Sequence, residues 1–277
     1  MAPSSQIALL ALLLILVAVV FKVIYWPGLR LARIHARQFA RSWDEILQRR
    51  LPFYRKLPAD TQRQLQNLIK VFLHDKQFVG CAGLEISDEI RVTVAAQACL
   101  LILNRDSDQY SKLRSILVYP STFVATRQVA DELGLVSTQH TAMLGESWSD
   151  GKVVLAWDNV ESGVCNLGDG QNVVLHEFAH QLDSESGATN GAPVLRTRGA
   201  YKSWAQVFSQ EFEELQQLAS RGHDSLIDHY GATNPAEFFA VVTETFFECP
   251  KQMQRNHSEL YQELSDFYQV DPSHWID

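Results

Sequence analysis

A continuous apolar stretch near the start of the chain restricts its fold more than any other feature. Between Ile7 and Trp26 the only charged residue is Lys22. A helix of about 20 apolar residues is long enough to cross the hydrocarbon core of a bilayer. We therefore expect residues 1–26 to form one N-terminal transmembrane helix that anchors the protein. A buried N-terminal helix and an uncleaved export signal are the two alternatives.

Basic residues follow this stretch and predict its orientation. They are Arg30, Arg33, Arg37 and Arg41. The positive-inside rule keeps such a flank in the cytoplasm, so we expect a single-pass protein of the inner (cytoplasmic) membrane whose catalytic part faces the cytoplasm. The spacing of the arginines places them on one side of a helix. Residues 27–50 thus form either a basic juxtamembrane helix along anionic headgroups or a solvated linker.

Residues 51–277 have the composition of one globular domain. The chain of 277 residues is 46% hydrophobic and 20% charged, which excludes disorder for most of it. No repeat or low-complexity tract indicates a further boundary. The formal net charge of -8 gives no general attraction to a phosphate backbone, so we expect no direct nucleic-acid binding. The four cysteines are scattered without a C-x-x-C pair, which argues against a thiolate zinc site.

Apolar periodicity and capping residues indicate many helices and few strands. A helical apolar stripe runs through residues 60–75, and Ser87 is a candidate N-cap for a second helix over residues 88–103. Further helices are expected over residues 172–184, 202–220 and 235–248, and short strands over residues 115–119 and 152–157. This balance favours an α+β domain over a regular parallel α/β sheet.

The chemistry concentrates in His176-Glu177-Phe178-Ala179-His180, an H-E-x-x-H pattern within a mostly apolar segment. Residues four apart share one face of a helix, so the imidazoles of His176 and His180 can converge on one metal ion. Glu177 stands beside them and can take a proton from a metal-activated water molecule. Two core histidines held by hydrogen bonds are the alternative. The pattern therefore predicts a candidate metal site on this helix.

A catalytic zinc site needs a third protein ligand and an open position for water. A metzincin would carry Gly at position 183 and His at position 186, but this chain has Asp183 and Ser186, so that family is excluded. A glutamate from a later helix is the natural candidate. Glu237 lies in the first turn of the helix expected after its N-cap Asn234. Its rivals are Glu211, Glu213 and Glu214 of the preceding helix.

Two blocks of the sequence resemble the Mlc titration factor A family of zinc-dependent peptidases. They are HEFAHQLD, from His176 to Asp183, and YGATNPAEFFAVVTETFF, from Tyr230 to Phe247. The second block is also similar to the corresponding helix of the anthrax lethal factor catalytic domain. The resemblance implies a zincin-like metallopeptidase domain, mainly helical with a small sheet. It also implies that an edge strand, taken as residues 152–157, lines the substrate cleft.

The same resemblance implies roles for individual residues. His176, His180 and Glu237 are expected to hold one Zn²⁺ per chain. Glu177 is then the general base and acid, and Tyr230 assists the oxyanion. These assignments select Glu237 over its rivals.

The function implied by the resemblance is hydrolysis of peptide or protein substrates through a zinc-activated water, as an aminopeptidase. The spacing of H-E-x-x-H does not by itself separate endopeptidases from exopeptidases. The alternative is a non-catalytic or dual-role regulator that binds and sequesters a transcriptional repressor protein. A degenerate zincin retained as a scaffold is a third possibility, and the intact H-E-x-x-H pattern argues against it.

Two further acidic residues lie near the predicted ligands in sequence. Asp183 follows His180 by three residues and is expected either to accept the outer N–H of a ligand imidazole or to cap the helix end. Glu244 follows Glu237 by seven residues, which places it on the same helix face. It either supports a ligand or is a solvated surface glutamate.

Overall fold

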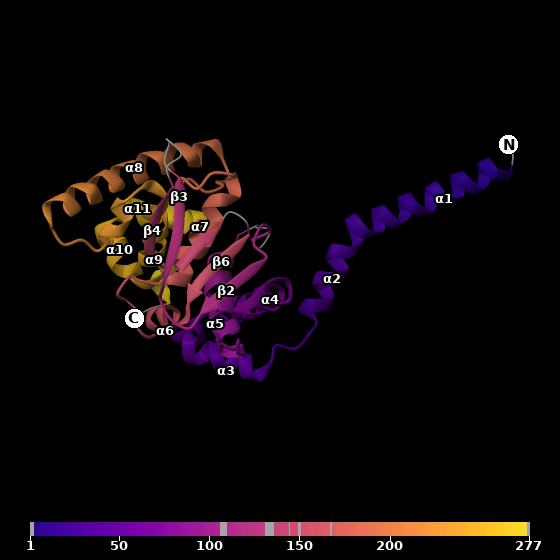
Figure 1. Ribbon diagram of the computed structural model, residues 1–277, viewed down its shortest axis with the longest axis horizontal. Coiled ribbons are helices and arrows are strands. Elements are labelled where there is room, and N and C mark those ends of the chain that lie inside the picture. Colours follow the sequence, from indigo (N-terminus) through magenta and orange to yellow (C-terminus); the bar gives the residue numbers. More distant parts are fainter. Residues whose placement is uncertain are drawn as a thin grey trace. The chain divides into compact units, whose positions relative to one another are not determined.

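The computed structural model describes residues 3–105, 110–130, 136–143, 145–148, 151–166 and 168–275. They belong to two compact units, Met1–Ala40 and Arg41–Asp277. Figure 1 follows the elements along the chain. The second unit begins within the segment 27–50 that the sequence assigns to a juxtamembrane helix or linker. The division into a membrane anchor (residues 1–26), a juxtamembrane segment (27–50) and a peptidase domain (51–277) stays a prediction.

The first unit is a helix that continues past a proline. Its parts are α1 (Pro3–Val20), a π-helical turn (Phe21–Tyr25) and α2 (Trp26–His35). Pro27 has no N–H to donate and its ring crowds the carbonyl one turn earlier, so the helix widens to π geometry in the preceding turn. The helix over Leu10–His35 contains an 18-residue window with a mean hydropathy of 2.4, and it is long and apolar enough to cross a membrane. The predicted apolar helix is thus confirmed, and it extends beyond residue 26.

The second unit is mainly helical with a small sheet. Its helices are α3 (Arg41–Arg50), α4 (Ala59–Asp75), α5 (Asp88–Leu100), α6 (Trp157–Cys165), α7 (Val173–Asp183), α8 (Arg198–Arg221), α9 (Pro235–Glu248), α10 (Pro250–Asn256) and α11 (Ser258–Tyr268). Its strands are β1 (Gln77–Gly80), β2 (Ser115–Tyr119), β3 (Phe123–Ala130), β4 (Val136–Met143), β5 (Gly145–Trp148) and β6 (Lys152–Ala156). Short 3₁₀ turns lie at Pro52–Lys56, Ser184–Ser186, His229–Ala232 and Pro272–His274. All five helices predicted in this unit are present, with ends shifted by a few residues.

The sheet corrects one expectation. Its strand order is β1-β2-β6-β5, with β1, β2 and β6 parallel and β5 antiparallel to β6. The prediction that residues 152–157 form an edge strand is therefore wrong, because β6 is interior and β5 is at the edge. The physical reason is the unbroken apolar run Val153–Ala156, which is buried throughout and suits an interior strand. β3 and β4 pair separately as an antiparallel hairpin.

Helix α7 lies at the centre of the packing. It contacts β5, β6 and α5, and it also packs against α9. The Phe178 ring of α7 is fully buried and lies 5.8 Å from the Phe72 ring of α4 and 5.0 Å from the Tyr110 ring. α8 runs along the outside of the group formed by α9, α10 and α11 (Figure 1). The α8 residue Trp204 meets Phe239 of α9 edge to face, at 5.7 Å between ring centroids.

The loop between α7 and α8 meets three helices at Gly191. The Gly191 N–H donates to Asp183 Oδ2 at the end of α7, at 2.7 Å. The Gly191 carbonyl accepts from Trp204 Nε1 of α8, at 2.9 Å. The residue has a φ of +77°, and a Cβ at this position would lie 2.3 Å from the carbonyl oxygen of Pro235 at the start of α9. Only glycine fits this backbone and this contact.

We expect Gly191→Ala to destabilise the protein more than Gly187→Ala does. Gly187 also has a positive φ, +98°, but a Cβ there meets nothing within 4 Å. The control should cost roughly 1–2 kcal/mol for the left-handed backbone alone. Gly191→Ala should cost a further 1–3 kcal/mol or so, because the added carbon overlaps Pro235. Urea denaturation measures both, and equal losses would show that the Pro235 contact adds nothing.

Candidate metal centre

The H-E-x-x-H helix begins at a strong cap. Asn172 is in an extended conformation, and its Oδ1 accepts from the backbone N–H groups of Val174, at 3.2 Å, and Leu175, at 3.1 Å. This bond fixes where α7 starts and so which face carries His176 and His180. Apart from its first residue and the two histidines, every residue of α7 is buried. Both histidines therefore reach the site from a rigid, packed element.

Glu237 is positioned by a similar N-cap at the start of α9. Asn234 Oδ1 accepts from the N–H groups of Ala236, at 3.0 Å, and Glu237, at 3.1 Å. Pro235 occupies the first helical turn, where its missing N–H costs nothing. Glu237 is thus placed in the first turn of α9, as the sequence predicts.

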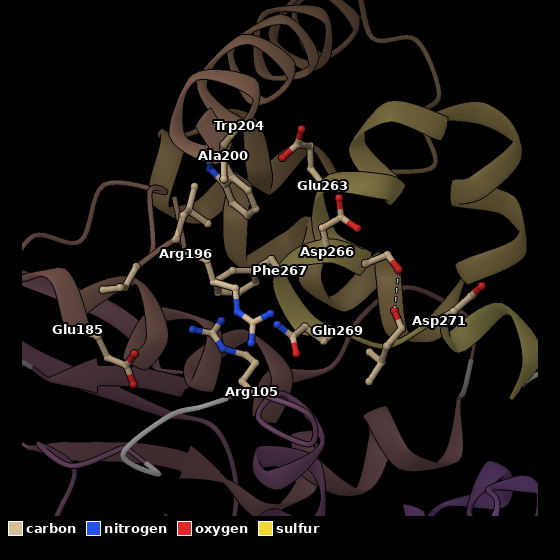
Figure 2. Close-up of a pocket in the computed structure, with 14 residues that line it drawn as sticks. Arg105, Glu185, Arg196, Ala200, Trp204, Glu263, Asp266, Phe267, Gln269 and Asp271 are labelled. Atoms are coloured by element: carbon tan, nitrogen blue, oxygen red, sulfur yellow. Dashed lines mark hydrogen bonds between the residues drawn. The ribbon is translucent and has the colours of Figure 1, made fainter. Parts of the chain in front are cut away.

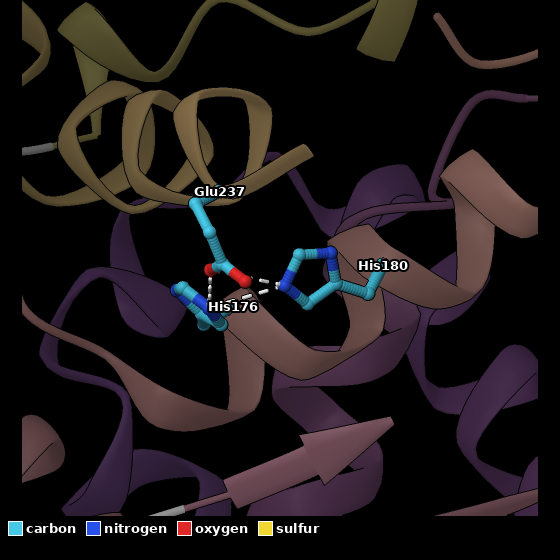
Figure 3. Close-up of side chains that lie close together, drawn as sticks. All are labelled: His176, His180 and Glu237. Carbon is cyan, nitrogen blue, oxygen red and sulfur yellow. Dashed lines mark hydrogen bonds and ion pairs between the residues drawn. The ribbon is translucent and has the colours of Figure 1, made fainter. Parts of the chain in front are cut away.

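The structure brings the three predicted ligands together (Figure 3). His176 Nε2 lies 3.1 Å from Glu237 Oε2 and 3.2 Å from His180 Nε2. His180 Nε2 lies 3.4 Å from the same Glu237 oxygen. Two imidazole nitrogens and one carboxylate oxygen, from two different helices, therefore form a small triangle.

The triangle has the dimensions of a zinc site. Zn²⁺ binds nitrogen and oxygen ligands at about 2.0–2.1 Å, so the ligands of a tetrahedral site lie about 3.3–3.4 Å apart. The three observed separations fall close to this value. Two histidines and one glutamate are also a ligand set typical of catalytic zinc, with the fourth position left for water. These residues fit a divalent ion in both geometry and chemistry.

The protons around His176 also favour a cation between the ligands. Its Nδ1 lies 2.7 Å from Glu244 Oε1, while its Nε2 faces Glu237. Burial opposes charge on the ring, yet hydrogen bonds to Glu237 and Glu244 outweigh it and raise the pKa of His176 to about 10. Burial likewise disfavours the charged form of Glu237, but the two histidines lower the pKa of Glu237 to about 2. A metal ion on Nε2 would replace the proton that the carboxylate otherwise holds there.

The bond between His176 and Glu244 decides between the two expectations for Glu244. That carboxylate is 7% exposed, so the expectation of a solvated surface glutamate is wrong. Because Glu244 accepts the Nδ1 proton of His176, the Nε2 lone pair points toward Glu237 and His180. The helix spacing from Glu237 was the sequence signal for this arrangement.

Asn172 donates hydrogen bonds to Glu244 and to a second buried carboxylate, Glu248. The role of Glu248 was not predicted from the sequence. The Asn172 backbone N–H donates to Glu244, and its side-chain Nδ2 donates to Glu248 Oε1 at 3.0 Å. Glu237, Glu244 and Glu248 follow each other at helical spacings of seven and four, so they share one face of α9. That spacing is visible in the sequence. Only burial, however, distinguishes glutamates that bind Asn172 from glutamates that face the solvent.

Glu177 and Tyr230 each lie between two of the predicted ligands in the chain and close to them in space. Glu177 is 4% exposed and directly follows His176 on α7. Tyr230 is 56% exposed, and its ring centroid lies 6.0 Å from that of His176. Burial, followed by the charges of Glu237 and Glu177, raises the pKa of Tyr230. Its hydroxyl therefore keeps its proton at neutral pH.

Asp183 makes a hydrogen bond with the following loop, and its carboxylate also interacts electrostatically with His180. It is fully buried, and its Oδ2 accepts from the backbone N–H of Gly191 in the next loop. Burial raises the pKa of Asp183, and the Gly191 N–H opposes that shift. Asp183 thus ties the loop to the end of α7.

The rival glutamates lie outside the cluster. Glu211 Oε2 pairs with His257 Nδ1 at 2.7 Å, while Glu213 and Glu214 are exposed on α8. Among the residues that the structure describes, His176, His180 and Glu237 are the group able to hold a metal ion.

Comparison with known proteins agrees with a metallopeptidase. A family model described as glucose-regulated metallo-peptidase M90 matches residues 26–269. The chain is 40% identical over 264 residues to the protein slr2042 of Synechocystis sp., an alignment that covers 95% of this chain and 96% of the relative. It is 31% identical over 239 residues to Mlc titration factor A of Escherichia fergusonii, covering 85% and 88% of the two chains. Mlc titration factor A of Klebsiella pneumoniae is 32% identical over 233 residues, covering 83% and 86%.

The protein is thus of the metallopeptidase class, and in this chain a His-His-Glu group is formed by two helices. The chain belongs to the glucose-regulated metallo-peptidase M90 family, and its resemblance to Mlc titration factor A is confirmed.

Glu248 predicts an unusual pH dependence of stability. Burial raises the pKa of Glu248 to about 8. Above the ordinary glutamate pKa of about 4.3, the unfolded chain releases this proton while the folded protein keeps it. The free energy of unfolding should then fall as pH rises from 5 to 8, by up to about 1.4 kcal/mol per pH unit from this group. Glu248→Gln should flatten that slope.

The measurement is urea denaturation at several pH values. Gln keeps an acceptor for Asn172 Nδ2 and has no titrating group. Glu213→Gln, on the exposed face of α8, is the matched control and should leave the slope unchanged. Parallel slopes for the parent and Glu248→Gln would show that Glu248 does not titrate in this range.

Proposed function

We propose that the protein is a zinc-dependent aminopeptidase of zincin-like fold. The observation that carries the proposal is the convergence of His176 Nε2, His180 Nε2 and Glu237 Oε2 at separations of 3.1–3.4 Å on an H-E-x-x-H helix. Membership of a metallopeptidase family supports the same reaction class. We infer zinc from the donor set of two histidines and one glutamate. We infer the aminopeptidase specificity from the family resemblance.

Glu177 is the proposed proton carrier. A zinc ion in this site would polarise the scissile carbonyl and lower the pKa of a nearby water molecule. Glu177 takes the proton from that water and later passes it to the leaving amine. Its position next to His176, in a buried segment, keeps the carboxylate close to the ligands and away from competing solvent.

Tyr230 is the proposed donor to the developing oxyanion. Its ring lies beside His176, it is largely exposed toward solvent, and its pKa is raised, so it holds a proton to donate. The backbone N–H of Tyr230 donates to Asp228 Oδ1 at 2.8 Å, which fixes the 3₁₀ turn that presents the ring. A phenol in this place can reach a group bound at the ligand triangle.

The edge strand β5 is the proposed docking strand for the peptide. It is at the edge of the sheet, antiparallel to β6, and it contacts α7. An edge strand offers free backbone donors and acceptors to an extended peptide. A substrate paired along β5 would lie next to the helix that carries Glu177.

We expect Glu177→Gln to retain zinc and to lose peptide hydrolysis by about 10²–10⁴-fold, because a general base is removed while every ligand stays. Tyr230→Phe should also retain zinc and lose roughly a hundredfold, as for one oxyanion donor. Glu237→Ala is the control that should lose the metal. The assay combines metal content by mass spectrometry with turnover of aminoacyl fluorogenic substrates. A fully active Glu177→Gln variant would overturn the assignment of the proton carrier.

A second candidate function is sequestration of a transcriptional repressor. The name of the relatives, Mlc titration factor A, supports it. The two functions separate in the same variant, because a protein that only binds its partner does not need Glu177. Pull-down of purified Mlc by the Glu177→Gln protein, with zinc present and no turnover, would favour sequestration. A protein that turns over substrates and never retains Mlc would exclude it.

We further propose that the N-terminal helix anchors the protein in the cytoplasmic membrane, with the catalytic unit in the cytoplasm. The apolar side chains between Leu10 and Ile24 are largely exposed, as they would be toward lipid. The basic residues after the helix support this orientation. Deletion of residues 1–26 should move the protein from the membrane fraction to the soluble fraction on cell lysis. Recovery of the full chain in the soluble fraction would contradict the anchor.

A further inference from the structure

A cavity of about 870 Å³ is a second candidate site (Figure 2). Its walls come from the loop before α8, the first turns of α8, the end of α11 and Arg105, which follows α5. None of the proposed ligands or catalytic residues lines it. Its volume is in the range of sites that bind small organic ligands, about 300–1,000 Å³.

Arg105 lines this cavity and carries one donor without a partner in the described part of the chain. Its guanidinium carbon lies 3.8 Å from the ring centroid of Phe267, so the group is stacked on an aromatic face. Stacking holds the guanidinium flat and leaves its N–H edge for other partners. Nη1 is buried and has no hydrogen-bond partner within the described part of the chain. A buried donor without an acceptor costs about 1–3 kcal/mol, which a ligand acceptor would recover.

A second guanidinium, that of Arg196, lies next to the first. Gln269 positions it: with its amide oxygen toward Arg196, Gln269 accepts from Nη2 at 2.9 Å and its amide nitrogen donates to the Asn104 carbonyl at 2.8 Å. The Asn104 side chain in turn donates to the Gln269 carbonyl at 2.8 Å. Burial lowers the pKa of Arg105, the charges of Tyr268, Glu185 and Tyr110 oppose that shift, and the positive charge of Arg196 adds to it. Two guanidinium groups this close favour an anionic group between them.

Carboxylates line the same cavity. They are Glu185, Glu263, Asp266 and Asp271. Figure 2 shows Glu263 and Asp266 on α11, apart from the two guanidinium groups. Ser203 Oγ donates to Glu263, and Gln262 Nε2 donates to Asp266 at 2.8 Å, so both carboxylates are reached by neutral donors. Neither hydrogen bond supplies a positive charge, so a cationic ligand group is a suitable partner for both carboxylates.

This distribution of charge selects the chemistry of the ligand. Four carboxylates against two guanidiniums disfavour a multiply charged anion such as phosphate, and the arginines disfavour a purely cationic ligand. A molecule that carries one anionic and one cationic group can pair with both the arginines and the carboxylates. Trp204 and Phe267 also line the cavity and contribute apolar surface.

We propose that this cavity binds a short peptide with free termini, its carboxylate at Arg105 and Arg196 and its ammonium at Glu263 and Asp266. Short peptides are also what the proposed peptidase consumes and releases, but this binding belongs to separate residues and does not depend on hydrolysis. The cavity is thus a second peptide site, distinct from the metal centre.

The test is calorimetric titration of the full chain in detergent, in the Glu177→Gln background so that no turnover occurs. Trialanine should bind, and a metal chelator should leave its affinity unchanged. Arg196→Gln should weaken binding about tenfold or more, because charge-assisted bonds to the carboxylate are lost. Arg198→Gln is the matched control, exposed two residues further along and outside the cavity, and should bind as the parent does.

Three further probes complete the design. N-acetyl-trialanine amide, which lacks both charges, and inorganic phosphate should not bind, and Arg105→Gln should lose binding as Arg196→Gln does. Arg196 is exposed, so its variant is expected to fold even where Arg105→Gln does not. Absence of trialanine binding at millimolar concentration, equal binding of the blocked peptide, or loss of binding on chelation would overturn the proposal. Because the titration needs no turnover, failure of the peptidase proposal leaves its result interpretable.

Discussion

The docking of α7 on α9 is the contact on which the candidate metal centre depends, and Asn172 is its central residue. One buried side chain caps α7 through its oxygen, while the nitrogens of the same residue bind two carboxylates of α9. Each of those polar groups would cost about 1–3 kcal/mol if it were buried without a partner. Because the histidines are on α7 and Glu237 is on α9, the contact that satisfies these groups also sets the distance between the ligands.

The charges at the centre explain why a divalent cation fits there. With both histidines neutral, Glu177, Glu237 and Glu244 concentrate negative charge in a mostly buried volume. Like charges at such spacing repel strongly when water is scarce. A proton on His176 relieves part of that repulsion, as its raised pKa indicates. A divalent ion would relieve more, and it would also satisfy all three candidate ligand atoms.

Local features of the sequence predicted a large part of this site. The H-E-x-x-H spacing put two imidazoles on one helix face, and Asn234 with Pro235 located the start of the helix that carries Glu237. These signals are short-range, since capping and helical periodicity act within one or two turns. The expectation of an edge strand at residues 152–157 was wrong because strand order depends on pairing between segments far apart in the chain. The expectation that Glu244 is a solvated surface residue was wrong for a similar reason, because helical spacing alone does not show whether a side chain is buried.

The sequence by itself determined that His176 and His180 share one helix face, where the helices of the candidate ligands begin, and that the N-terminal region contains an apolar helix. Each of these follows from interactions between residues close together in the chain. Only the tertiary structure decided that Glu237 reaches both histidines, that Glu244 and Glu248 are buried against Asn172, and that Asp183 ties down the following loop. Those outcomes depend on how helices separated by some sixty residues pack, because packing determines which polar groups lose water and must find a partner in the protein.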